Sequence, residues 1–395
     1  MSNLPTVKIA PEVLKWARES IHTPKDAVVQ NFSQVSKKTY KITRDSLDKI
    51  ETEITPIKST LLKEFSRLYK RPLAVFFLKK PPQDQKAPTD FRTQRNLDSG
   101  FSPATMIILR SAQRVQLFAR ELFEDLGEPI QFKLDNYKLN SNPVTLAAEL
   151  RKTIGLDFES QKKFKTPDKF FAWLRLKLEG TGVFVIKEPF PTGDALAFSL
   201  TDEQPFVIVV NSKWGANNYA PKIFSLLHEY AHILLRHGGI CNDFISSKEK
   251  IEIFCNRFAA NFIIPQDLFN QELKRITKNF QLSNIDNYLT ELGLIFKASK
   301  SALLVRFLER HLISKEFFDK RIFEANVKYS LRAKKEIPFR VFPHIRAINS
   351  MGRSFSELIL RAVDTEKITR DSAADFLGVQ PTQLGKIAEF LKKKT

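Results

Sequence analysis

The segment Leu226-Leu227-His228-Glu229-Tyr230-Ala231-His232-Ile233-Leu234 decides how the rest of this chain is interpreted. It contains the pattern H-E-x-x-H, which is typical of zinc metalloproteases. Residues four apart lie one above the other on a helix, so His228 and His232 can present both imidazoles to one cation. Glu229 then projects beside the cation, where it can take a proton from a water whose pKa the cation has lowered. The segment predicts a helix that carries a metal site with Glu229 as catalytic base.

The residues that flank this pattern favour a buried helix. They are apolar on nearly every side, as is expected of a core helix. Two histidines and a glutamate inside such a helix cost free energy unless they are paired or coordinated. The alternative interpretation is a histidine pair satisfied in the core without any metal.

A third metal ligand is expected downstream, because a catalytic zinc has three protein ligands and one open position. Residues 250–265 predict a second apolar helix that ends near Pro265. Glu252 is the acid most closely embedded in its apolar pattern, and Asn256 lies one turn further on the same face. The alternative is that Glu252 is an ordinary acid near a helix N-terminus, where the helix dipole favours negative charge.

The second helix has the form E-x-x-C-N-x-F-A-A and ends in Ile-Pro. This pattern is formed by Glu252, Cys255, Asn256, Ala259, Ala260 and Pro265. Together with the H-E-x-x-H helix it resembles the ImmA/IrrE family of metallo-endopeptidases. The resemblance implies a zincin-like core in which His228, His232 and Glu252 bind zinc and Glu229 is the general base. It also implies a specific protein substrate, typically a helix-turn-helix repressor that is cleaved under stress or during mobile-element induction.

Length and composition indicate a multidomain chain. The 395 residues are too many for one small core, and 43% hydrophobic with 27% charged residues is an ordinary globular mixture. No run approaches eighteen apolar residues and the N-terminus lacks a secretory pattern, so we expect no membrane span and a cytoplasmic location. Cys241 and Cys255 cannot make a disulfide framework. Small buried residues are the favoured interpretation of both, over additional metal ligands or a redox sensor.

The net charge of +19 is concentrated at the two ends. Residues 1–95 hold 19 Lys and Arg against 10 Asp and Glu, and residues 330–395 hold 13 against 7. Such an excess indicates contact with DNA through the terminal segments, although charge alone supports only non-specific attraction. The alternative is a solvated, lysine-rich surface.

Residues 1–80 predict a domain of short helices. Helices are expected from Pro11, from Thr23, from Arg44 and from Pro56. The succession is compatible with a helix-turn-helix bundle. It resembles the repressor-type (XRE) helix-turn-helix that precedes the peptidase in many ImmA/IrrE members, particularly over residues 69–78. It departs from that pattern at residues 33–40 and at Glu53, where glycine is usual, so the predicted domain is a degenerate one.

The rest of the chain divides into a linker and two further parts. Residues 81–100 are rich in proline and charge and predict a linker. Residues 101–310 form the predicted zinc metallopeptidase domain, with helices at 102–126, 144–154 and 167–178. Strand signals appear only in its middle, at residues 183–186, 195–200 and 206–211, and predict a small antiparallel sheet before the metal helix. In a peptidase of this type an exposed sheet edge would bind an extended substrate peptide.

Residues 311–395 predict a helical C-terminal module. Thr369 is expected to cap a helix that ends at Gly378, and Pro381 lies near the start of the next. This order is typical of a helix-turn-helix. Since Gln383 and Lys386 are its only clear polar base readers, a packing or protein-contact role is favoured over specific DNA binding.

The sequence therefore predicts an α+β, mostly helical fold with a zincin-like core, flanked by helical modules. The predicted function is a zinc-dependent endopeptidase. The group that stabilises the oxyanion is left open among Tyr219, Tyr230 and His237. The sequence contains no glycine-rich phosphate loop, so we expect no nucleotide cofactor. Two alternatives remain: a DNA-binding regulator with a structural or vestigial zinc site, and a partner in a toxin-antitoxin or phage-defence system.

Overall fold

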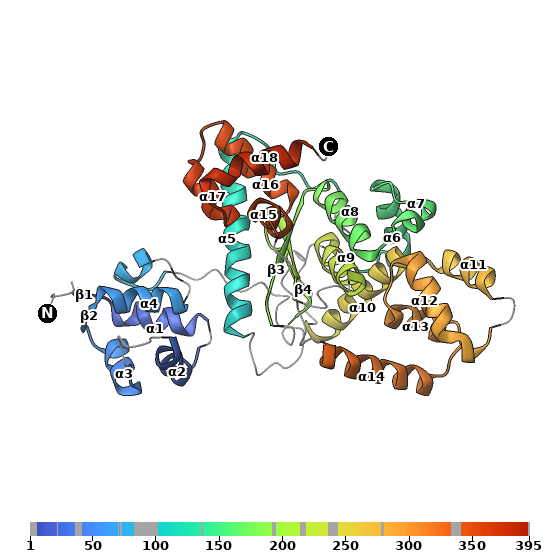
Figure 1. The fold of residues 1–395 in the computed structure, drawn as a ribbon, viewed down its shortest axis with the longest axis horizontal. Coiled ribbons are helices and arrows are strands. Elements are labelled where there is room, and N and C mark those ends of the chain that lie inside the picture. The colour runs from blue at the N-terminus through green and yellow to red at the C-terminus, as the bar shows by residue number, and fades with distance from the viewer. Residues whose placement is uncertain are drawn as a thin grey trace. The chain divides into compact units, whose positions relative to one another are not determined.

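The structure is a computed structural model that describes residues 6–21, 23–35, 42–69, 71, 73–82, 102–135, 137–191, 195–213, 219–235, 244–277, 280–332 and 341–393. The chain divides into two compact units, residues 1–111 and 112–395, and the division falls within helix α5 (Pro103–Asp125) (Figure 1). Each unit is considered by itself. No helix in the described ranges is long and apolar enough to cross a membrane. Most of the linker predicted at residues 81–100 lies outside the described residues.

The first unit is a small helical domain with one short β-ribbon. Its helices are α1 (Pro11–Glu19), α2 (Lys25–Val35), α3 (Arg44–Thr52) and α4 (Ser59–Tyr69), followed by a 3-10 helix (Leu73–Phe77). Arg18 and Glu51 form a buried ion pair in its core, with N–O distances of 2.7 and 2.9 Å. A buried, two-pronged pair of this kind fixes how α1 meets α3, because loss of either partner would leave the other charge poorly compensated in the core.

The strand prediction for this unit was wrong. Strands were expected only in the middle of the chain, yet β1 (Thr6–Lys8) pairs antiparallel with β2 (Pro56–Lys58). The helix expected from Pro56 consequently begins at Ser59. Three-residue strands carry too little alternation to be recognised, and the partners lie some fifty residues apart in sequence.

The second unit is built around a three-stranded sheet covered by helices. The strands are β3 (Val183–Glu188), β4 (Ala197–Leu200) and β5 (Phe206–Asn211), in the order β3-β5-β4. All six residues of β5 are buried, as is typical of a central strand with both faces covered. Helices α6 (Pro143–Thr153), α7 (Phe158–Lys163) and α8 (Pro167–Glu179) precede the sheet, whereas α9 (Tyr219–Leu235) and α10 (Phe244–Ile263) follow it.

The sheet is mixed rather than antiparallel. The α+β, mostly helical class is confirmed, but β3 runs parallel to β5 and only β4 runs antiparallel to it. The chain passes from edge strand β3 to edge strand β4 before it enters the centre. Strand order is set by packing of the whole unit, so three apolar runs separated by turns do not reveal it.

Helices α11 (Gln266–Ile276), α12 (Ile285–Phe296) and α13 (Lys300–Glu309) continue the core after α10. The C-terminal part consists of α14 (Lys315–Arg332), α15 (Pro343–Met351), α16 (Arg353–Asp364), α17 (Arg370–Leu377) and α18 (Leu384–Lys392). Thr369 caps α17 by accepting a hydrogen bond from the backbone N–H of Ser372, and Gly378 ends it in the left-handed conformation. The local structure predicted for this end is thus confirmed.

A buried ion pair on α8 attaches α15 and α16 to the sheet. Arg175 Nε donates to Glu179 Oε1 at 3.0 Å, and the same guanidinium donates to the carbonyls of residues 349 and 350 at 2.6 and 3.1 Å. Glu179 Oε2 accepts from the backbone N–H groups of residues 353 and 354 at 2.9 and 3.1 Å. A side chain at Gly352, where φ is +88°, would place its Cβ 2.4 Å from Glu179 Oε1. We refer to this group as the Arg175–Glu179 junction.

Candidate metal centre

Helix α9 places both histidines of the H-E-x-x-H pattern on one side. Its residues contain no glycine, and its one proline, Pro221, lies in the first turn, where no backbone hydrogen bond is lost. It packs against β4, β5, α8 and α10 (Figure 1). Within this core helix His228 and His232 are 6% and 7% exposed, so neither ring can rely on bulk water to satisfy its nitrogens.

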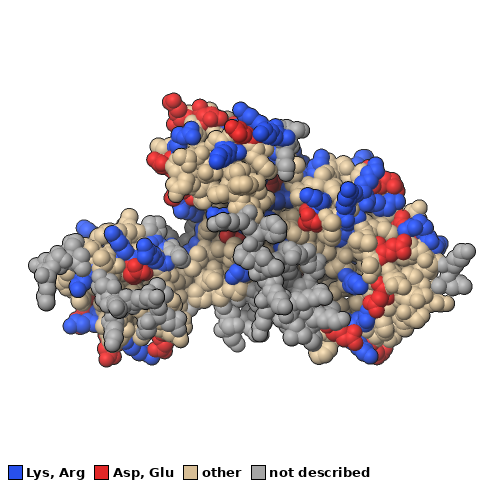
Figure 2. All heavy atoms as spheres, in the orientation of Figure 1, with Lys and Arg blue, Asp and Glu red and all other residues tan. Residues whose placement is uncertain are grey.

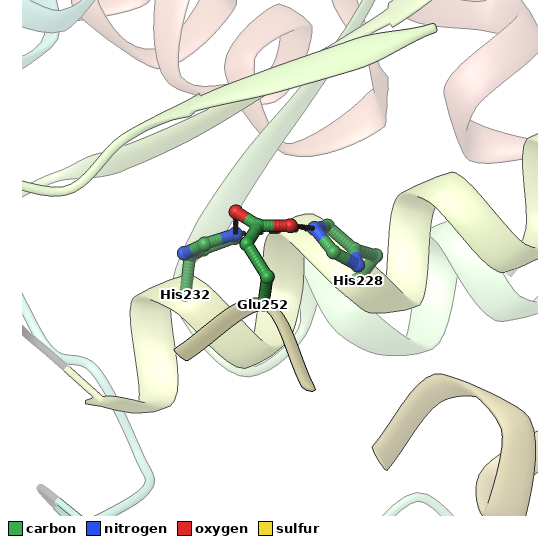
Figure 3. A group of neighbouring side chains, drawn as sticks. All are labelled: His228, His232 and Glu252. Carbon is green, nitrogen blue, oxygen red and sulfur yellow. Dashed lines mark hydrogen bonds and ion pairs between the residues drawn. The ribbon is translucent and has the colours of Figure 1, made fainter. Parts of the chain in front are cut away.

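Helix α10 brings Glu252 to the two histidines. Glu252 Oε2 lies 3.3 Å from His228 Nε2, its other oxygen lies 3.5 Å from His232 Nε2, and the two Nε2 atoms are 3.2 Å apart. Figure 3 shows the three side chains converging from the two helices. Ligand atoms of a tetrahedral zinc, each about 2.0–2.1 Å from the metal, are separated by about 3.3 Å. The separation of the two nitrogens matches this value, and Glu252 places one carboxylate oxygen near each nitrogen, so the three side chains can share one ion.

The donor atoms also have the chemistry that a divalent metal needs. Two imidazole nitrogens and a carboxylate are a common set for catalytic zinc, and among the described residues this is the group of three that could hold an ion. Lone pairs held this close repel one another unless a proton or a cation lies between them. The side chain of Glu252 is 31% exposed, so the group can be reached from its side.

The end of α10 is held by three buried side chains. Carbonyl groups of residues 262–264 accept hydrogen bonds from Arg151 at 2.7 Å, Gln161 at 2.9 Å and Arg306 at 2.9 Å. These carbonyls have no partner within the helix, so the three donors satisfy groups that would otherwise be buried and unpaired. The contacts fix α10, and with it Glu252, relative to its neighbours.

A second layer of contacts orients His228. Its Nδ1–H donates to Asn256 Oδ1 at 3.1 Å, which orients the ring with Nε2 aimed at the other two ligand atoms. His232 Nδ1 is buried without a well-formed hydrogen bond from the described residues, and the Cys255 thiol is its neighbour. Cys255 is fully buried, as predicted, and burial raises the pKa of its thiol. Cys241 lies outside the described residues.

The histidines and Glu252 shift one another's pKa values. Burial would raise the pKa of Glu252, but the hydrogen bonds and charges of His228 and His232 lower that pKa far below the ordinary range. Burial would lower the pKa of His232, but Cys255 and the carboxylates of Glu252 and Glu229 raise it well above 6.5. Both shifts favour a proton shared between the histidines and the carboxylate in the metal-free cluster.

Glu229 points to the sheet rather than to His228, His232 and Glu252. Its Oε2 accepts a hydrogen bond of 2.7 Å from Ser199 Oγ on β4, and its residue is 7% exposed. It is close enough to raise the pKa of His232 by its charge. A carboxylate beside the ligand atoms, but outside the group of three, is where a general base belongs.

Two of the three candidates for stabilising the oxyanion lie among the described residues. The hydroxyl of Tyr230 lies 2.8 Å from Thr181 Oγ1 and is fully buried in the core, which argues against a role at the metal. Tyr219 begins α9, nine residues and about 13 Å of helix before His228, and its ring packs 5.3 Å from that of Phe171. The structure argues against it too. His237 lies outside the described residues.

Ser199 is the contact that sequence reasoning missed. It occupies the third position of the apolar strand Ala197–Leu200. A small polar residue within such a strand was the available signal, but serine is common in strands and its partner is 30 residues away. Asn256 was placed on the correct face, and the structure adds its hydrogen bond to His228.

Comparison with known proteins identifies part of the second unit. Residues 178–308 match the family model of peptidase M78, described as the IrrE N-terminal-like domain. The matched range begins at the end of α8 and includes the sheet, α9 and α10. The resemblance to the ImmA/IrrE family is thereby confirmed for this range, and a metallopeptidase domain of this kind implies a bound metal. No curated protein and no solved structure matched the chain.

Proposed function

We propose that this chain is a zinc-dependent endopeptidase that cleaves a specific protein. The observation that supports this most strongly is the convergence of His228, His232 and Glu252, whose nitrogens and oxygens lie 3.2–3.5 Å apart, with Glu229 next to them. Such a set leaves one coordination position for substrate or water. Zinc bound there would polarise the substrate carbonyl and lower the pKa of a coordinated water.

The protein's own groups then have separate tasks. His228 and His232 would offer their Nε2 atoms to the metal, and Asn256 orients the ring of the first. Glu229 takes a proton from the attacking water on a carboxylate oxygen and passes it to the leaving amine of the peptide. The helices that carry these residues are packed into the core, so the geometry exists before substrate binds.

The substrate that we propose is a helix-turn-helix repressor in a stress, mobile-element or defence circuit, by analogy with the family. Strand addition to the sheet remains our proposal for its binding, and the structure limits where this can occur. The carbonyls of Val185 and Lys187 on edge strand β3 accept from Arg175 and from Ser350 Oγ. Edge strand β4, which carries Ser199, is the edge that remains for this proposal. Its four residues are buried, so a substrate peptide would have to displace what covers them.

The direct test replaces the base and leaves the ligands. Glu229→Gln should retain one zinc per chain while the rate of cleavage falls by about 100- to 10,000-fold, because the amide cannot accept the proton. The measurement compares zinc content and cleavage of a co-expressed candidate repressor by mass spectrometry. Glu203→Gln, a change at an exposed acid outside the site, is the matched control. Cleavage by Glu229→Gln at the wild-type rate would refute this mechanism.

DNA binding is a second candidate, favoured by one feature of the first unit. Lys8 and Lys58 are exposed on the β1–β2 ribbon, and Lys63 and Arg67 are exposed one turn apart on the helix that follows. On the face drawn in Figure 2, however, basic side chains of this unit lie among acidic ones. A salt-dependent affinity for duplex DNA that Glu229→Gln leaves unchanged would support a regulator, and no affinity at low salt would exclude it.

A further inference from the structure

Ser199 is buried in the middle of β4 and directs its side chain at Glu229. The residue is 4% exposed, Glu229 is 7% exposed, and the distance between Oγ and Oε2 is 2.7 Å. An ionised carboxylate can only accept hydrogen bonds, so the serine is the donor. A hydrogen bond to a charged acceptor is among the stronger ones that a neutral side chain can make.

This contact distinguishes the two oxygens of Glu229. Oε2 is bound to Ser199, whereas Oε1 receives no hydrogen bond from any residue that the structure describes. The terminal torsion of a glutamate side chain is broad, and a carboxylate without such a partner has no preferred orientation about it. The serine hydroxyl therefore selects one rotational state of the base.

We propose that Ser199 is a positioning residue, whose hydroxyl holds the Glu229 carboxylate so that Oε1 is the oxygen that accepts the proton from the attacking water. This inference rests on the proposed peptidase function. The serine touches the base and not the reacting atoms, and it gains or loses no bond during the reaction. Its position on β4 ties the orientation of the base on α9 to the sheet.

The test uses two substitutions of equal shape. Threonine keeps the hydroxyl and valine replaces it with a methyl group, and both are β-branched residues that a strand accommodates. The probe is acetohydroxamate, which chelates zinc through its oxygens and gives up a proton that a neighbouring carboxylate can accept. Its Kd is measured by calorimetry on the full zinc-loaded chain, with zinc content determined for each variant.

Ser199→Val should bind one zinc per chain and weaken acetohydroxamate by about tenfold, the lower end of the range for loss of an outer contact at a metal site. Ser199→Thr should bind acetohydroxamate with the wild-type Kd, because it keeps the hydroxyl. In a chain that already carries Glu229→Gln, adding Ser199→Val should change Kd little, because the contact is already altered.

A wild-type Kd in Ser199→Val, or equal weakening in Thr and Val, would overturn the positioning role alone. A wild-type chain that binds neither zinc nor acetohydroxamate would overturn the peptidase function as well.

Discussion

Two groups of buried charged side chains lie in the second unit, and they differ in where their polar atoms point. At the Arg175–Glu179 junction the guanidinium and the carboxylate bind each other and the backbone groups of residues 349–354. At the metal centre the nitrogens of His228 and His232 and the oxygens of Glu252 point at one another across 3.2–3.5 Å. The junction has a protein partner for each charge, whereas the donor atoms of the metal centre are arranged to share one cation.

The difference shows why burial of charge alone does not identify a functional site. Structural ion pairs and ligand sets are both buried, and both shift pKa values. A structural ion pair is satisfied by other protein groups, whereas a ligand set is satisfied by a bound cation. Removing a residue from the junction should reduce stability without affecting metal, whereas removing one from the centre should abolish metal binding.

The largest effect is expected at the junction. Glu179→Ala leaves Arg175 buried without a counter-charge and removes the acceptor of two backbone N–H groups at the start of α16. Loss of one partner of a buried pair costs about 3–5 kcal/mol. Urea unfolding should show this loss, and the folded fraction should keep its zinc. A loss below about 1 kcal/mol, or a folded variant without zinc, would erase the distinction between the two groups. Glu179→Gln, which keeps an acceptor, should cost less.

A smaller effect, on metal alone, is expected at the edge of the centre. Asn256→Ala removes the acceptor that fixes the His228 tautomer and should weaken zinc binding by about 10- to 100-fold. Asn261, on the same helix, binds Arg306 at 3.0 Å instead, so Asn261→Ala should lower stability and leave zinc affinity unchanged. Competition with a chelator measures both. Equal zinc affinities for the two variants would show that Asn256 has no role in the site.

The smallest predicted effect, for a change of one pH unit, concerns pH. In the metal-free chain the raised pKa of His232 stabilises the fold below about pH 6.5, and this contribution is lost as pH rises through the raised pKa. The lowered pKa of Glu252 stabilises it above about 4.5, and that contribution is lost only at strongly acidic pH. Zinc must displace the bound proton, so its affinity should rise about tenfold per pH unit for each proton released.

The measurement for this prediction is the difference in Tm between zinc-loaded and metal-free protein at several pH values. It should widen from pH 5.5 to pH 7.5. The junction supplies the control, because Glu179→Gln should shift both Tm values downward together. A difference that stays constant with pH would mean that zinc does not compete with a proton at His232.

The site was more predictable from sequence than the fold around it. His228, Glu229 and His232 lie within one helical turn, where spacing alone fixes their directions. The prediction of Glu252 as the third ligand required only that the helix carrying it pack against the helix of the two histidines. Ser199 depends on the order of strands, and the parallel pairing of β3 with β5 depends on contacts across the unit. The β1–β2 ribbon joins residues far apart in sequence and was missed for the same reason.

The Arg175–Glu179 junction shows the same limit. Four residues separate Arg175 and Glu179 on α8, so an ion pair between them was foreseeable. Their contacts with residues 349–354 lie more than 170 positions away in sequence. Nothing in the spacing of α8 indicates that its ion pair attaches the C-terminal helices.

Zinc content per chain tests the central claim most directly. The comparison is between the wild type, His228→Ala and Glu252→Ala, with Glu179→Gln as a control that alters a buried charge outside the centre. We expect about one zinc in the wild type and in Glu179→Gln, and none in the other two, since three ligands are needed to hold it. A wild-type chain without zinc after reconstitution, or full zinc in Glu252→Ala, would contradict the proposed metal centre.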